Sequence, residues 1–142
     1  MFFKKNKTED TDNNLLEPEQ DPLFKTPEEI YGALLKITGR GKLLRLEIEG
    51  DAQVYTTSIL KVSFKSRCFV FDKLVPAQGN VFIQEGKSFK ITTDFQGVLI
   101  EFIVNRKVTY REDANCFIAY FPENLLYKQR RESFRVSIPQ GM

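Results

Sequence analysis

The alternation of hydrophobic and polar residues predicts one helix followed by a series of short strands. A helix is expected to begin after Thr26, because this residue is a good N-cap, Pro27 suits the first helical position and Glu29 completes a capping box. Four apolar residues then recur at helical spacing and predict one buried face: Ile30, Ala33, Leu34 and Ile37. Gly39 and Gly41 are expected to end the helix.

The period changes to two after Gly41. Leu44, Leu46 and Ile48 alternate with charged residues, which is typical of a half-buried strand. Further strands are expected at 54–61, 67–71, 88–95, 97–104, 107–110 and 115–121. About seven strands at this spacing, with 13 Phe and 5 Tyr, predict a mainly β fold, a small closed or nearly closed antiparallel barrel with the helix over one end.

The same pattern divides the chain into three parts. Residues 1–25 lack both periods and contain Pro18 and Pro22, so we expect a disordered acidic tail. Residues 26–122 are the predicted barrel domain. Residues 123–142 are expected to form a linker, or a single helical turn, followed by a strand in which Phe134, Val136 and Ile138 alternate with polar residues. We interpret that strand as the first strand of a truncated second domain.

Composition excludes several kinds of chemistry. The chain has no histidine, which removes Ser-His-Asp and Cys-His nucleophilic sites and His-ligated zinc. Cys68 and Cys116 lie far apart without a Cys-x-x-Cys spacing, and we expect reduced core thiols in a cytoplasmic protein and not a disulfide. Apolar runs are too short to span a bilayer, and no secretory signal is visible, so membrane insertion is not expected.

Charge is distributed unevenly along the chain. Residues 1–25 carry a net charge of −2, residues 128–135 carry +3, and the remainder is nearly neutral. Three guanidinium groups stand together in the basic segment, at Arg130, Arg131 and Arg135. Arginine can grip phosphate bidentately and stack on a purine, so these residues favour phosphate or nucleotide binding as much as a solvated basic linker.

Other candidate sites have simpler structural explanations. Gly86-Lys87-Ser88 lacks the earlier glycine of a phosphate-binding loop and precedes a predicted strand, so we expect a turn. The carboxylate pairs Glu47 with Glu49 and Glu112 with Asp113 are expected to be solvated surface charges. Core packing is expected to explain most phenylalanines better than a base-stacking platform does, namely Phe64, Phe69, Phe71, Phe82, Phe89, Phe95 and Phe102.

The basic segment also resembles a known junction. Residues 127–139, Tyr-Lys-Gln-Arg-Arg-Glu-Ser-Phe-Arg-Val-Ser-Ile-Pro, are similar to the interdomain junction of bacterial YcgR-type flagellar brake proteins, where a Gln-Arg-Arg-x-x-x-Arg stretch opens a PilZ domain. The body and its Phe121-Pro122-Glu123-Asn124-Leu125 exit are similar to the N-terminal domain of that family. The resemblance implies a split barrel, with cyclic di-GMP bound to Arg130, Arg131 and Arg135 between the two domains.

This resemblance implies a regulatory domain of a cyclic di-GMP receptor that acts as a flagellar brake, with no catalytic activity and no cofactor. The implied partners are cyclic di-GMP, a PilZ domain of the same protein and flagellar motor switch or stator proteins, and the implied location is the cytoplasm at the flagellar basal body. The second ligand motif of PilZ domains, Asp or Asn followed by x-Ser-x-x-Gly, does not occur after Arg135. We therefore expect these 142 residues alone to bind the ligand weakly or not at all.

Two alternatives belong to other functional classes. A nucleic-acid-binding barrel could use exposed phenylalanines and the basic end, but the nearly neutral body argues against this interpretation and against DNA as a partner. A flavin-dependent enzyme could use a similar split barrel, but the sequence contains no phosphate-cradling loop that favours it.

Overall fold

The structure is a computed structural model that describes residues 22–129 and confirms the mainly β fold. Its strands form two antiparallel sheets. The six-stranded sheet has the order β2 (Leu23–Phe24), β11 (Leu125–Gln129), β8 (Val98–Val104), β7 (Phe89–Phe95), β3 (Leu44–Ile48) and β4 (Val54–Thr57). The four-stranded sheet has the order β5 (Ile59–Ser63), β6 (Cys68–Asp72), β10 (Cys116–Tyr120) and β9 (Thr109–Arg111).

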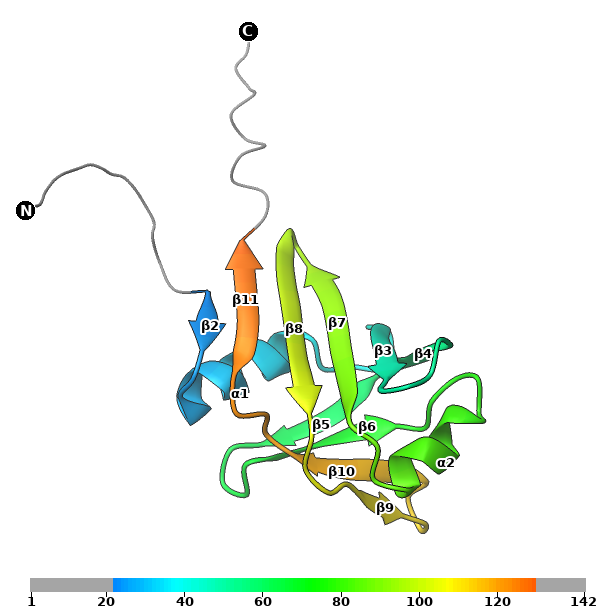
Figure 1. Cartoon of the computed structure of the whole chain (residues 1–142). Helices are drawn as coiled ribbons and strands as arrows, with labels where there is room; N and C mark the ends of the chain where they lie inside the picture. The colour runs from blue at the N-terminus through cyan, green and yellow to red at the C-terminus, as the bar shows by residue number, and fades with distance from the viewer. Residues whose placement is uncertain (1–21, 130–142) are drawn as a thin grey trace, which may run out of the picture.

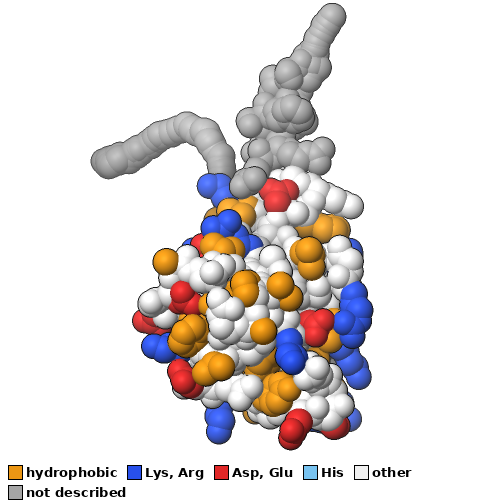
Figure 2. All heavy atoms as spheres, turned by 90° about the vertical axis from the view of Figure 1, so that its right-hand side faces the viewer, with side chains coloured by type: hydrophobic (Ala, Val, Ile, Leu, Met, Phe, Trp, Pro, Cys, Tyr) orange, Lys and Arg blue, Asp and Glu red, His pale blue; other side chains and the backbone are white. Residues whose placement is uncertain are grey.

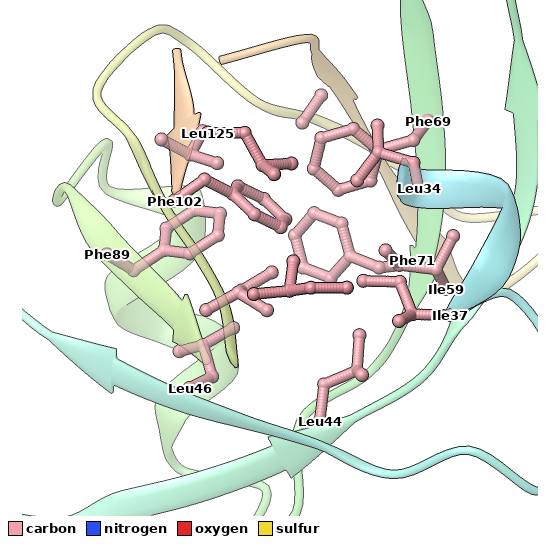
Figure 3. Packing of buried hydrophobic residues seen from close by; sticks show 14 of the residues in the cluster. Leu34, Ile37, Leu44, Leu46, Ile59, Phe69, Phe71, Phe89, Phe102 and Leu125 are labelled. Carbon is pink, nitrogen blue, oxygen red and sulfur yellow. The ribbon is translucent and has the colours of Figure 1, made fainter. Parts of the chain in front are cut away.

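Between them the two sheets enclose one hydrophobic core (Figures 1 and 3). Figure 1 shows β7, β8 and β11 standing upright above the strands of the smaller sheet, which run across the base of the molecule. This arrangement is like a split barrel; the strands are divided between two sheets instead of forming one closed cylinder.

The first helix, α1 (Pro27–Lys36), begins as the sequence predicts. The Thr26 side chain accepts a hydrogen bond from the Glu29 amide, and the Glu29 carboxylate accepts one from the Thr26 amide, so the capping box is complete. The helix ends at Lys36, before Gly39, whose amide donates to the Ile59 carbonyl at 2.8 Å. The buried face of the helix packs on the core, where Leu34 and Ile37 lie near Phe69 and Phe71 (Figure 3).

The strand predicted at 54–61 is two strands in two different sheets. β4 pairs with β3 in the larger sheet, and β5 pairs with β6 in the smaller one. The break falls at Ser58, whose buried hydroxyl donates to the Arg40 carbonyl and whose carbonyl accepts from the Asp72 amide. A period-two pattern does not distinguish one sheet from the other, which explains the error.

A second helix, α2 (Gly79–Gln84), corrects the expectation of a single helix. Tertiary contacts hold this short segment. Ile83 is buried in the core, and the Asn80 side chain accepts a hydrogen bond from the Leu74 amide at 2.8 Å. Gly79 lies so close to Tyr55 that an added Cβ would stand 2.6 Å from the ring, so only glycine fits there without a shift.

The ends of the domain also differ from the expected boundaries. Leu23–Phe24, which we expected in the disordered tail, forms β2, and Leu125–Gln129, which we expected in a linker or helical turn, forms β11. β11 pairs with β2 on one side and with β8 on the other. The larger sheet therefore continues up to the residue that precedes Arg130.

Aromatic residues fill the core, as the sequence predicts. Phe69, Phe71, Phe89, Phe102 and Phe117 are almost completely buried. Their rings contact one another, with the Phe71 and Phe117 centroids 5.2 Å apart and the Phe69 and Phe102 centroids 5.8 Å apart. These rings are unavailable for stacking on nucleic-acid bases.

Candidate functional site

The candidate site begins with β11, because this strand leads directly into the arginine segment. Leu125 is fully buried, and the strand pairs residue by residue with β8 from Leu126 opposite Glu101 to Gln129 opposite Val98. Figure 1 shows the end of β11 next to the turn between β7 and β8. The strand is thus held in the sheet up to Gln129, the residue that precedes Arg130 in the sequence.

Tyr127 fastens this end of β11 to two other elements. Its ring stacks on Phe24 of β2 at a centroid distance of 4.6 Å. Its hydroxyl accepts a hydrogen bond from Lys36 Nζ of α1 at 2.8 Å, and its amide donates to the Pro22 carbonyl at 2.8 Å. Strand, helix and N-terminal segment therefore meet at one residue that lies three positions before Arg130.

Lysines gather around the same end of the sheet. Lys42 Nζ donates to the Lys36 carbonyl at 3.0 Å and lies 5.4 Å from the centroid of the Phe95 ring. Phe95 pairs with Val98, the residue opposite Gln129. Lys36, Lys42 and Lys128 are all exposed and outnumber Asp94, the exposed carboxylate beside the β7–β8 turn, so this end of the sheet presents a net positive charge to solvent.

The three predicted ligand-binding residues, Arg130, Arg131 and Arg135, lie outside the described residues. Their positions therefore stay a prediction. What the structure adds is the strand that ends at Gln129 and the two lysines from α1 and the following loop. These lysines lie about 90 positions before the arginines, and no local sequence pattern links the two regions, so the sequence alone does not indicate them.

The four carboxylate candidates lie at the surface, as expected, and two of them, Glu47 and Asp113, form ion pairs. Glu47 contacts Arg45 Nη2 at 3.1 Å and Lys90 Nζ at 3.5 Å. The hydrogen bond from Arg45 and the positive charge of Lys90 lower the pKa of Glu47. Asp113 pairs with Arg111 at 3.0 Å, which likewise lowers the pKa of Asp113. A general acid needs the opposite shift, so these contacts do not favour acid catalysis.

The glycine turn matches its predicted structural role, and the cysteines match theirs in part. Gly86, at φ +91°, lies in the turn after α2, and the chain continues into strand β7 instead of the helix that a phosphate-binding loop requires. Cys68 and Cys116 are both free thiols; Cys116 is buried as predicted, whereas Cys68 is only half-buried, so its predicted core position is wrong.

Tyr55 is a buried polar group that the sequence analysis did not single out. Its hydroxyl donates to Asp51 Oδ2 at 2.6 Å. This hydrogen bond to a carboxylate, together with burial, raises the pKa of Tyr55 to about 12. The contact fixes the loop before β4 against the core, and it is a structural feature because the Tyr55 ring is almost fully enclosed.

Residues 22–129 also lack a candidate metal site and a helix that could span a membrane. This range contains no cluster of Cys, Asp and Glu side chains that could hold a metal ion. Neither of its helices has the length and apolar character of a membrane-crossing helix.

Comparisons with known proteins agree on one family. Residues 23–127 match the family described as the PilZN domain of the flagellar regulator YcgR. The chain is 33% identical over 116 residues to flagellar brake protein YcgR 1 of Paraburkholderia phytofirmans, covering 81% of this chain and 44% of the relative. It is 36% identical over 87 residues to flagellar brake protein YcgR of Cupriavidus taiwanensis, covering 59% and 32%. The chain thus spans less than half the length of these relatives.

Solved structures show the same fold. Escherichia coli YcgR in complex with c-di-GMP is similar with a TM-score of 0.66 and 25% identity, over 78% of this chain and 48% of that one. The separate YcgR-N domain from Escherichia coli is similar with a TM-score of 0.62 and 20% identity, over 77% and 96%. The second likeness concerns the fold alone. Together these matches extend over the described sheets, including β11 up to Tyr127.

Proposed function

Because this chain belongs to the PilZN domain family of the flagellar regulator YcgR, we propose that it is the regulatory domain of a cyclic di-GMP receptor that acts as a flagellar brake. In this proposal the domain is a responder and not an enzyme. The ligand binds where the chain passes from β11 into a PilZ domain, and the resulting rearrangement changes the contact with motor switch or stator proteins.

The observation that carries this proposal is the geometry of β11. A strand held by β8, β2 and α1 runs directly into Arg130 and Arg131. Arginines that follow an anchored strand lose less conformational freedom on binding than arginines in a free linker. The nearby lysines Lys36 and Lys42 add a field that attracts the two phosphates of the ligand.

The nucleic-acid alternative is less well supported. Of the seven phenylalanines considered for a stacking platform, Phe69, Phe71, Phe89 and Phe102 are buried in the core, whereas Phe64, Phe82 and Phe95 are half-buried. On the face that Figure 2 shows, acidic and basic side chains are interspersed and form no continuous basic stripe. A sequence-independent nucleic-acid surface needs both a basic track and exposed aromatic rings.

Calorimetric titration with cyclic di-GMP tests the ligand and its site. The two proteins to compare are this chain and a chimera in which the remainder of the Paraburkholderia relative follows the matched region. We expect binding in the chimera and weak or no binding in this chain, because this chain spans less than half the length of its YcgR relatives. A low-micromolar dissociation constant for this chain alone would contradict the half-site prediction.

Arginine variants of the chimera test the assignment of residues. Arg131→Ala and Arg135→Ala should each weaken binding about tenfold or more, since a charge-assisted hydrogen bond contributes roughly 1.5 to 3 kcal/mol. Both should also abolish the ligand-driven change in shape that solution scattering records. Arg106→Ala is the matched control, because Arg106 stacks on Tyr120 at 4.4 Å and should leave ligand binding unchanged. Equal effects of all three substitutions would refute the site.

A further inference from the structure

A groove crosses the outer face of the larger sheet at the end opposite to the arginine segment. One hollow of about 380 Å³ lies between β2, the start of β11 and the end of β8. A second hollow of about 450 Å³ lies between the end of β8, the start of β7 and the end of β3. Both are lined by Ile103 and Asn105, so they adjoin and form one groove across five strands.

Part of the floor of this groove is apolar, mainly in the first hollow, where a solvent-facing sheet would normally be polar. Ile103 faces outward from β8 and is 56% exposed, and Leu23 of β2 is 37% exposed. Leu126 lies opposite Leu23 in the strand register and is half-buried. An exposed row of large apolar side chains inside a hollow is typical of a surface that a partner covers.

The walls of the groove are acidic. Glu101 and Glu123 line the first hollow, and Glu47 and Glu49 line the second. Lys90 is the one basic side chain among the lining residues. Glu47 pairs with it at 3.5 Å and with Arg45 beside the groove at 3.1 Å, so the excess negative charge comes from Glu49, Glu101 and Glu123. The groove therefore combines an apolar floor with excess negative charge, and its chemical complement is apolar and positively charged.

We propose that this groove binds a basic amphipathic helix of another protein. Five neighbouring strands span about 19 Å at roughly 4.8 Å per spacing, which matches about twelve helical residues at 1.5 Å each. The occupant is a helix and not an extended strand. An extended strand would need backbone hydrogen-bonding partners, which the face of a sheet does not offer, whereas a helix forms its backbone hydrogen bonds internally. Its apolar side chains cover Ile103 and Leu126, and its lysines or arginines face the four glutamates.

This surface is separate from the cyclic di-GMP site, but β11 connects the two. Leu126 near the start of β11 lines the groove, and Gln129 at its end precedes Arg130. The proposal makes no use of the ligand and is tested without it.

Nuclear magnetic resonance titration of this chain with a defined peptide tests the proposal. The probe is a synthetic amphipathic helix of about twelve residues, with leucines on one face and lysines elsewhere. We expect shifts confined to the groove, including the amides of Ile103, Asn105 and Glu123, and weaker binding as salt rises. A peptide in which glutamates replace the lysines should bind at least about tenfold more weakly.

Matched variants identify the groove as the binding surface. Ile103→Ser should weaken binding about fivefold or more, while Leu43→Ser, which removes a 66% exposed leucine elsewhere, should leave it unchanged. Glu49→Lys should weaken binding about threefold or more, while Glu112→Lys changes the same charge on a remote turn and should have no effect. All four positions are exposed or outward-facing, so the variants are expected to fold.

Three results would overturn the proposal. Shifts outside the groove would do so, and so would equal affinity of Ile103→Ser and Leu43→Ser. The third result concerns removal of residues 1–21. That segment contains Phe2, Phe3 and three nearby lysines, so it has the apolar and basic residues that the groove is proposed to bind. Peptide binding that tightens several-fold after this removal would assign the groove to the N-terminal segment of the same chain.

Discussion

The two ends of the six-stranded sheet differ in charge, although the same strands build both. The end at which β11 leaves the sheet carries the exposed lysines Lys36, Lys42 and Lys128. The opposite end carries four glutamates around an apolar groove: Glu47, Glu49, Glu101 and Glu123. One end suits an anionic ligand and the other suits a cationic partner.

This difference shows how a small domain can present two unlike surfaces on one rigid element. β11 is only five residues long, and its buried Leu125 anchors it between the two surfaces. The charges at each end come from segments far apart in the chain; Lys36 and Lys128, for instance, are 92 positions apart. Substitutions in β11, which both surfaces share, should therefore have larger effects than substitutions at one end of the sheet.

The largest expected effect comes from the shared strand. Leu125→Ala should lower the free energy of unfolding by about 3 kcal/mol, because it leaves a cavity where the side chain is fully buried. Leu126→Ala, on the half-buried outer face of the same strand, should cost only about 1 kcal/mol. Urea denaturation measures both values. Similar losses for the two variants would show that β11 is not anchored by its inward face.

A smaller effect is expected at the basic end. In the chimera described above, Lys36→Gln combined with Lys42→Gln should weaken cyclic di-GMP binding about threefold, and binding should become less sensitive to salt. Lys61→Gln, an exposed lysine of β5 in the other sheet, is the control and should leave the affinity unchanged. Calorimetry at two salt concentrations measures this difference. An unchanged affinity in the double variant would remove these lysines from the ligand site.

The smallest effect is the pH dependence of the acidic end. The pKa of Glu47 lies below its ordinary value of 4.5, because Arg45 donates a hydrogen bond to the carboxylate and Lys90 adds positive charge. The contacts of Glu47 with Arg45 and Lys90 therefore stabilise the fold at pH values above 4.5. This stabilisation is lost as the pH falls through the lowered pKa of Glu47. The side-chain carboxyl resonance of Glu47 should titrate below 4.5 and move back toward 4.5 in Arg45→Gln. The same titration midpoint in both proteins would contradict the ion pair.

Local patterns in the sequence predicted most individual elements correctly. Thr26 and Glu29 fix the start of α1 through neighbouring backbone groups, so the capping box is visible without any tertiary information. Alternation at Leu44–Ile48 predicted both the strand and its buried face. Buried phenylalanines were also predicted, because aromatic residues at alternating positions gain most by leaving water.

The elements that the sequence analysis missed depend on distant contacts. α2 contains Gly79, Val81 and Ile83, which are poor helix formers, and the helix is held by packing on Tyr55 and by the Asn80 hydrogen bond. Pro122 and Asn124, which precede β11, are typical of a linker. The segment is nevertheless a strand, because β8 and β2 supply partners for its backbone hydrogen bonds. Leu74, which donates the Asn80 hydrogen bond, is only six positions away, but Tyr55, β8 and β2 all lie more than 20 positions from the segments they hold.

The sequence by itself determined the mainly β composition, the position of α1, the buried faces of most strands and the arginine segment that resembles a ligand-binding junction. These features rest on residue type and on spacing over a few positions. Only the tertiary structure decided that 54–61 crosses between two sheets, that β11 belongs to the larger sheet, and that lysines gather at one end of it and glutamates at the other. Those outcomes depend on which distant segments pair, and pairing is a property of the whole chain because each strand needs a partner for its backbone groups.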